Sequence, residues 1–528
     1  MNGSIHALNS SAESTIPLTR GLARNTFFNL LGWAWPVTLS FIAVPYILSG
    51  LGTDAYGVFG IISVVAGYLG LLSGPMAMGN VRFMAEAFGR QDWDEFRRTV
   101  VAGIVIVGSL AALGAVAMFL SADLLVRSVF KIPAQLIPSA IVAFRLAAIS
   151  FFLNGLTSAM NGIPAAMRRY DILNAISLSV GTLNTAGILF AIWVGSGLVG
   201  AVIAQVLSSA LAVAAFGAHT WKVWRSLPCS GHTVEPDRTL IRRLVSFSAL
   251  LFAGSLASTI GLRIDRTLVG ILLGSSAVTY YVVPAKITDQ IPGFIGRLTA
   301  ALYPLSAEGL ARGMSDELLR LYDRMVRISL FISGFLAAML LVSARDVLYL
   351  WVGADIAGHS WLVLIFLAIS VIWRGPGGVA YQVGNGLGRG DLYLGVSLLT
   401  LALCTLSVIG FSIRFGVVGA ALGMLIGLAL VNLIYDTLTR KRLLGQPGWV
   451  AIFLPYLKTI AAMGITGFCL KLWPHPVTWW GNLLVKLCIA AFLYSVASVS
   501  LGLLKTSELR LFLSKTRLSL RFSRHPDA

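Results

Sequence analysis

Charged residues are scarce in this sequence. Asp, Glu, Lys and Arg make up only 12% of its 528 residues, whereas an average soluble domain has roughly 25%. A soluble protein of this length could not cover its surface with so few charges. Apolar residues reach 57%, and runs of about 20 of them, enough for a helix to cross a bilayer, recur along the chain. The composition therefore predicts an all-α polytopic membrane protein.

Residues for metal and disulfide chemistry are also few. The 4 cysteines form no CxxC pair, and the 6 histidines show no HExxH or other metal-ligand spacing. We therefore expect no metal site, no disulfide framework and no cofactor. Residues 1–25 are polar and contain no apolar core before a cleavage site, so we expect no secretory signal. No loop between the apolar runs exceeds about 25 residues, too short for a catalytic domain, so we do not expect an enzyme.

The apolar runs, bounded by charged or turn residues, predict about fourteen transmembrane helices. We expect them near residues 27–51, 57–79, 100–120, 139–161, 173–194, 198–219, 245–273, 279–303, 325–344, 361–383, 392–413, 417–437, 451–471 and 480–503.

The positive residues indicate the orientation of these helices. An even number of spans puts both termini on one side, and most of the 40 Lys and Arg residues fall in loops on that side. The positive-inside rule then places both termini in the cytoplasm. The net charge of +18 thus mainly sets topology, and we expect no nucleic-acid partner. The basic C-terminal segment suits an interfacial helix on anionic membrane lipids.

An internal repeat divides the spans into two sets of six. Residues 51–98 align without gaps on 273–320, and the charged pairs Ala85-Glu86 and Asp94-Glu95 recur as Ala307-Glu308 and Asp316-Glu317. Six is an even number, so the two copies share one orientation and suit alternating access. A scaffold without a transport role is the alternative. The expected organisation is a cytoplasmic tail 1–26, a first six-helix bundle 27–219, a linker 220–244, a second bundle 245–437, an appended helix pair 451–503 and a basic cytoplasmic tail 504–528.

Charges inside the spans distinguish the two copies. A charge near the bilayer centre costs roughly 2.5 to 3.5 kcal/mol, so such residues usually face a cavity or a partner. The first two spans carry almost none, whereas the second copy carries many. The candidate substrate-binding residues are Arg263, Arg266, Arg374, Lys286 and Arg297, with Arg145 near the outer end of the fourth span, and the acidic residues expected to pair or couple with them are Asp265 and Asp289. Their positive surplus predicts an anionic substrate.

Spacing suggests how these charges are used. Arg263 and Arg266 lie on one helix face because they are three residues apart. Lys286 and Asp289 have the same spacing, and an ion pair that only orients their helix is as consistent with it as substrate contact. Arg297 and Arg145 lie near span ends, where snorkelling to the interface is an equal alternative. We expect Asp265 to restrain an arginine, with proton coupling as the second interpretation.

Several diffuse motifs resemble one transporter family. They are Arg24-Asn-Thr-Phe-Phe-Asn-Leu-Leu-Gly32, Gly52-Thr-Asp-Ala-Tyr-Gly57, its second-half counterpart from Asp265 to Gly274, and Arg168-Arg-Tyr-Asp171. Together they resemble the Wzx-type polysaccharide and O-antigen flippases of the multidrug/oligosaccharidyl-lipid/polysaccharide exporter superfamily. The resemblance covers nearly the whole chain.

This resemblance implies export of an undecaprenyl-pyrophosphate-linked oligosaccharide across the bacterial inner membrane for surface or exopolysaccharide synthesis. It implies that a cationic cavity receives the pyrophosphate, a role that Arg263, Arg266 and Arg374 fit, and that polysaccharide polymerase machinery is among the partners. Three alternatives stay open: a cation-coupled multidrug exporter, a peptidoglycan-precursor flippase, and a multi-span glycan polymerase or ligase. The exporter should carry an acidic residue inside the first bundle, and the polymerase a large outer loop; neither is seen in the sequence.

Overall fold

The computed structural model describes residues 35–167, 169–227, 256–299, 302, 306, 315–387, 390–443, 449–471 and 479–503. All secondary structure in these ranges is helical. The chain divides into two compact units, Met1–Leu256 and Ala257–Ala528. The predicted tails 1–26 and 504–528, and most of the predicted linker, lie outside the described residues.

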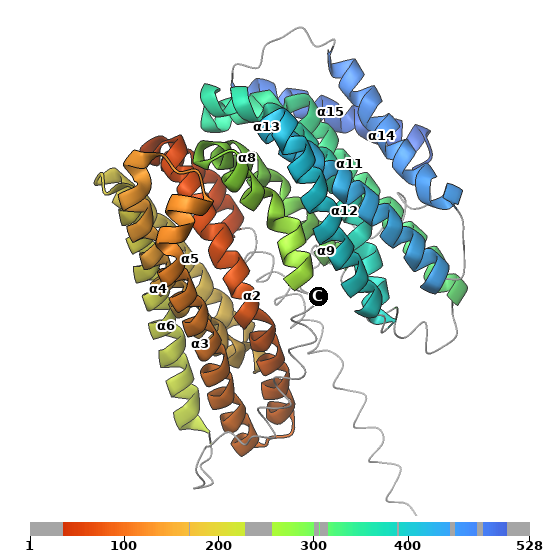
Figure 1. Ribbon diagram of the computed structural model, residues 1–528. Coiled ribbons are helices and arrows are strands. Elements are labelled where there is room, and N and C mark those ends of the chain that lie inside the picture. Colours follow the sequence, from red (N-terminus) through yellow and green to blue (C-terminus); the bar gives the residue numbers. More distant parts are fainter. Residues whose placement is uncertain are drawn as a thin grey trace, which may run out of the picture. The chain divides into compact units, whose positions relative to one another are not determined.

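The first unit is a bundle of long antiparallel helices (Figure 1). Its helices are Trp35–Leu51, α2 (Thr53–Gly89), α3 (Trp93–Leu124), α4 (Ile137–Ala166), α5 (Tyr170–Trp193) and α6 (Gly197–Ser226), with a π-helical turn (Leu125–Val129) and a 3₁₀ turn (Ala134–Leu136) before α4. Asp92 caps α3 by accepting a hydrogen bond from the Glu95 amide at 2.9 Å. Arg169, the residue before α5, forms an ion pair with Asp171 at 3.0 Å.

The second unit contains a helix over residues 256–272 and then α8 (Ser275–Thr288), α9 (Gln290–Thr299), α11 (Ser315–Val352), α12 (Ala354–Gly386), α13 (Gly390–Leu443), α14 (Trp449–Lys471) and α15 (Trp480–Ser500). The helices α14 and α15 pack against each other and against α11. A close approach there depends on Gly334, because a Cβ at this position would lie 2.2 Å from the Tyr494 hydroxyl.

Each of the fourteen expected spans contains a helix in the described part of the chain, so the all-α polytopic fold is confirmed. Ten helices there are long and apolar enough to cross a membrane. Several extend beyond the apolar run that predicted them, because polar residues continue the helix past the hydrocarbon core; α11, for example, begins at Ser315. The repeat and the domain limits stay predictions.

The helix α13 is two spans joined at one glycine. Gly416 has φ 59° and ψ −137°, a conformation that glycine adopts without a Cβ penalty. The two halves then pack closely, because Gly419, Gly423 and Gly427 follow at four-residue spacing and bring one backbone against the other. A Cβ on Gly423 would lie 2.6 Å from the carbonyl oxygen of Ser407. Small residues at this spacing are a common way for membrane helices to approach each other.

The span expected over 279–303 is broken in the structure. α8 ends at Thr288, Asp289 is its C-cap, and α9 begins at Gln290. Pro292 explains the break, because its nitrogen cannot donate to the carbonyl of Thr288 four residues earlier. The consequence is that the Asp289 carboxylate lies at a helix junction and reaches side chains from other helices.

Candidate functional site

Three charged side chains meet inside the second unit. Arg266 comes from the helix over residues 256–272, Asp289 from the α8–α9 junction and Arg374 from the middle of α12. The Arg266 guanidinium donates a hydrogen bond to Asp289 Oδ2, and Arg374 Nη1 lies 3.8 Å from Asp289 Oδ1. The side chains of Arg266 and Arg374 are 17% and 22% exposed, so both guanidinium groups are held largely away from solvent. We call these three residues the arginine cluster.

The arginine cluster has more donors than its carboxylate can accept. Arg266 Nε is buried without a hydrogen-bond partner in the described part of the chain. The Arg374 guanidinium forms an ion pair with Asp289, but the distance between them is too long for a hydrogen bond. Two planar guanidinium groups with N–H donors that Asp289 does not pair match the geometry of a phosphate or pyrophosphate.

A cavity of about 270 Å³ lies beside Arg374. It is lined from four elements: the helix over residues 256–272, α9, α12 and α13. Arg374 supplies the positive charge, and Tyr381 and Tyr393 pack edge to face with ring centroids 4.7 Å apart. Four residues after Arg374, Gly378 also lines this cavity, and a Cβ there would meet nothing within 4 Å.

Asp265 was expected to restrain an arginine, and this stays a prediction. Its Oδ2 accepts a hydrogen bond from the Tyr281 hydroxyl at 2.6 Å, and its Oδ1 accepts one from the backbone amide of Arg266 at 2.8 Å. Asp265 is 3% exposed. The carboxylate that pairs with both arginines is Asp289, because the break before α9 places it there.

The remaining predicted residues differ in exposure and in the unit to which they belong. Arg263 and Arg297 are exposed, and Lys286 is partly buried near the end of α8. Arg145 belongs to the first unit, where it forms an ion pair with Asp123 at 2.6 Å and lies over the Phe119 ring. Their roles in substrate binding stay predictions.

A second buried ionic group was missed by the sequence reasoning. Arg440 of α13, whose side chain is 4% exposed, pairs with Asp323 of α11 at 2.6 Å and with Asp436 at 3.2 Å. The Tyr322 hydroxyl donates to Asp436, and Arg440 lies over the Tyr322 ring. The four-residue spacing of Asp436 and Arg440 is the signal that was available. Since this arginine is already paired with two carboxylates, the group fixes α11 against α13.

Comparison with known proteins identifies the family. The family model described as "Polysaccharide biosynthesis protein" matches residues 22–310, more than half of the chain. The chain belongs to this family. A Shigella flexneri protein named as an O-antigen transporter is 23% identical to this polysaccharide biosynthesis family protein over 418 residues, covering 76% of this chain and 93% of that protein. The resemblance drawn from the sequence motifs is therefore confirmed.

Solved structures share the fold of this polysaccharide biosynthesis family protein. The inward-facing form of a multidrug resistance MATE family transporter of the MOP superfamily superposes with a TM-score of 0.66 and 18% identity, covering 78% of this chain and 97% of that one. The lipid II flippase MurJ in an inward closed conformation gives a TM-score of 0.67 and 12% identity, covering 90% and 98%. At these identities the likeness concerns the fold alone, that of a multi-pass membrane protein.

Proposed function

We propose that this protein is a flippase that moves an undecaprenyl-pyrophosphate-linked oligosaccharide from the cytoplasmic to the periplasmic leaflet of a bacterial inner membrane. Both termini lie in the cytoplasm, and the two bundles open alternately to either side. The glycan is delivered to polysaccharide polymerase machinery, and the protein itself catalyses no covalent step. Membership of the polysaccharide biosynthesis family and the similarity to a protein named as an O-antigen transporter support this proposal.

The arginine cluster is the observation that carries the proposal. Two largely buried guanidinium groups share one carboxylate, Arg266 Nε has no hydrogen-bond partner among the described residues, and Arg374 lines a cavity. A pyrophosphate brings two or more negative charges and several acceptor oxygens to such a site. It would complete the hydrogen bonds that Asp289 leaves open, while the polyprenyl tail stays in the lipid.

The membrane potential favours transport in the proposed direction. With the cell interior negative, outward movement of one negative charge is favoured by about 2.3 kcal/mol per 100 mV, so a pyrophosphate with two charges gains about 4.6 kcal/mol. An electrical driving force of this size needs no ATP site.

A neutral interior in the first unit favours an anionic lipid over a cation-coupled drug. A cation-coupled exporter is expected to place a carboxylate inside its first bundle. A cavity of about 650 Å³ there, formed by α2, α4, α5 and α6, has no acidic residue among its lining side chains.

Export in cells tests the proposed function. In a strain lacking this gene, the double variant Arg266→Gln and Arg374→Gln should reduce surface glycan at least tenfold and leave lipid-linked glycan on the cytoplasmic leaflet. Arg127→Gln, which removes an exposed arginine paired with Asp123 in the first unit, is the matched control and should export normally. Native export by the double variant at equal expression would overturn the proposal.

A further inference from the structure

The cavity of the first unit contains polar groups but no charge. Ten of its 21 lining residues are Ser, Thr, Asn or Gln, and the rest are apolar or glycine. They come from α2, α4, α5 and α6, and all lie at least seven residues from either end of their helices. At 1.5 Å per residue this is about 10 Å inside the ends, at the depth of the hydrocarbon core.

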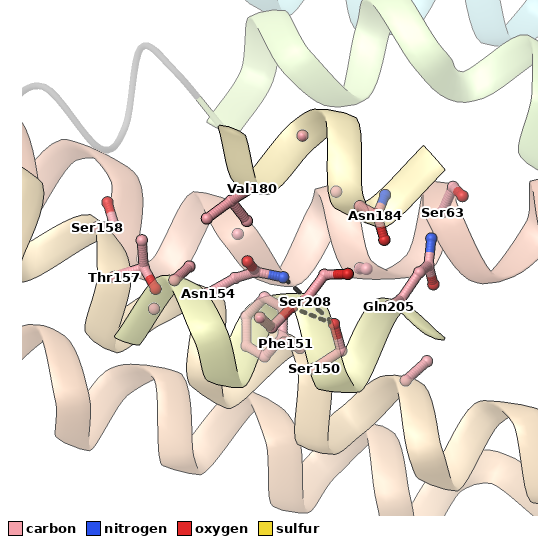
Figure 2. Close-up of a pocket in the computed structure, with 18 of the residues that line it drawn as sticks. Ser63, Ser150, Phe151, Asn154, Thr157, Ser158, Val180, Asn184, Gln205 and Ser208 are labelled. Atoms are coloured by element: carbon pink, nitrogen blue, oxygen red, sulfur yellow. Dashed lines mark hydrogen bonds between the residues drawn. The ribbon is translucent and has the colours of Figure 1, made fainter. Parts of the chain in front are cut away.

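Polar side chains from different helices point into this cavity. In Figure 2, Asn154 of α4, Asn184 of α5 and Gln205 of α6 point into the space between their helices. Ser150 and Ser209 share a hydrogen bond of 2.9 Å, and the Asn154 amide donates to Ser150 at 3.3 Å. Several helices therefore contribute polar side chains to the lining of this cavity, and some of these side chains hydrogen-bond to one another.

The network leaves one buried acceptor of the cavity lining unused. Asn184 Oδ1 is buried and has no hydrogen-bond partner among the described residues. An unpaired amide oxygen at membrane depth is costly, because lipid offers it no donor. The orphaned oxygen indicates that a polar molecule occupies this space during the protein's working cycle.

The residue types that line the cavity indicate the chemical class of that molecule. No arginine or lysine is present to hold an anion, and no carboxylate, histidine or cysteine is present to hold a cation or a metal among the lining side chains. Hydroxyl and amide groups both donate and accept, as sugar hydroxyl and acetamido groups do. The volume of about 650 Å³ lies within the range of pockets for drug-sized ligands.

From these observations we propose that the first-unit cavity is a binding site for neutral sugar residues, separate from the arginine cluster. This inference rests on the proposed function for the source of its ligand, the uncharged part of a lipid-linked glycan. The two units then divide the substrate by chemistry: the second takes the pyrophosphate and the first takes the carbohydrate.

Binding of paired lipids tests the inference. The probes are undecaprenyl pyrophosphate, the same lipid carrying a neutral disaccharide of galactose and N-acetylglucosamine, and the free disaccharide. Each is titrated into the full-length protein in nanodiscs. The native protein should bind the glycosylated lipid about tenfold more tightly than the bare lipid, equivalent to about 1.4 kcal/mol.

Two variants should remove this difference. Gly181→Leu fills the cavity from α5, since a Cβ there meets nothing within 4 Å, and Asn184→Leu removes the unpaired amide. Both should bind the glycosylated and the bare lipid equally, with bare-lipid affinity unchanged within twofold. The matched controls are Gly217→Leu on α6, also open to an added Cβ but outside the cavity lining, and Asn174→Leu on α5, likewise outside it. These controls should keep the tenfold difference.

The outcomes separate this inference from the proposed function. A retained tenfold difference in folded Gly181→Leu and Asn184→Leu, or no difference in the native protein, overturns the sugar site. Failure of the native protein to bind bare undecaprenyl pyrophosphate overturns the proposed function instead. In that case the free disaccharide decides: weak binding that Gly181→Leu abolishes supports the sugar site, and equal binding by native protein and variant overturns it.

Discussion

The two units of this protein hold cavities of different chemistry. The cavity of the first unit is lined by hydroxyl and amide groups without a charge, whereas that of the second unit is lined by Arg374 and three tyrosines. Both lie within bundles of apolar helices. The difference indicates that the units do not perform the same task, although the sequence predicts that they are copies of one repeat.

A second contrast concerns two carboxylates. Asp123 in the first unit pairs with Arg127 and Arg145, and Asp289 in the second pairs with Arg266 and Arg374. The arginines of the first pair are 60% and 45% exposed, whereas those of the second are 17% and 22% exposed. Similar pairing therefore leaves the first two arginines open to solvent, whereas the second two are held largely away from it.

The largest expected effect concerns the buried charges that hold the second unit together. Arg440→Leu leaves Asp323 and Asp436 without their partner, and breaking a buried pair costs about 3 to 5 kcal/mol. We expect a clear fall in the unfolding temperature of the protein in detergent. The control Arg90→Leu removes an exposed i,i+4 pair and should change stability by less than about 1 kcal/mol. Equal stability of the two variants would contradict the structural role of Arg440.

A negative charge should weaken binding of the pyrophosphate when it is placed in the second-unit cavity, but not when it is placed in the first-unit cavity. Arg374→Glu places a carboxylate beside Asp289, and we expect the affinity for bare undecaprenyl pyrophosphate to fall about 100-fold or more, since hydrogen bonds to charged groups contribute about 1.5 to 3 kcal/mol each. Asn154→Asp introduces the same kind of charge into the first-unit cavity with little change in shape, and should leave this affinity unchanged. Equilibrium titration in nanodiscs measures both, and equal losses would refute the division of tasks.

Neutralising Asp289 and Asp123 one at a time compares the two carboxylates that each pair with two arginines. Asp289 competes with an incoming anion for Arg266 and Arg374, so Asp289→Asn should bind bare lipid pyrophosphate about three- to tenfold more tightly and release it more slowly. Asp123→Asn is the matched change in the first unit and should have no effect. Weaker binding by Asp289→Asn, in protein whose unfolding temperature is native, would mean that Asp289 positions the arginines rather than competing for them.

Salt should produce the smallest effect. Raising NaCl from about 0.05 to 0.5 M shortens the Debye length and should weaken binding of the bare lipid several-fold. The additional affinity contributed by a neutral disaccharide should not change, because no charge lines the cavity proposed to hold it. A salt-dependent sugar contribution would assign the sugar to a charged region instead.

The fold could be predicted from the sequence because its signals are local. Apolar runs of bilayer length predicted a helix in each of the fourteen expected spans, and the expected spans 392–413 and 417–437 meet next to Gly416, where the structure turns within α13. The span 279–303 was expected to be continuous, because prolines within membrane helices often only kink them, and the sequence does not tell a kink at Pro292 from a new helix end.

The candidate site could be predicted only in part. Arg266 and Arg374 stand out because charges are rare in apolar spans. Asp265 and Asp289 were both expected to pair with the charged residues, but the meeting of Asp289 with two arginines could not be foreseen, because the sequence does not tell which side chains from different helices meet. The neutral cavity was missed altogether. Ser150, Asn154 and Ser158 follow at four-residue spacing on α4, but uncharged polar residues in a membrane helix are common enough that such a stripe attracts little notice.

The most direct test of the central claim is the binding of bare undecaprenyl pyrophosphate to the full-length protein in nanodiscs. The double variant Arg266→Gln and Arg374→Gln should bind it at least about 100-fold more weakly than the native protein, from the loss of two charged donors. Arg127→Gln should bind as the native protein does. Native affinity in the folded double variant would contradict the assignment of the anion to the arginine cluster.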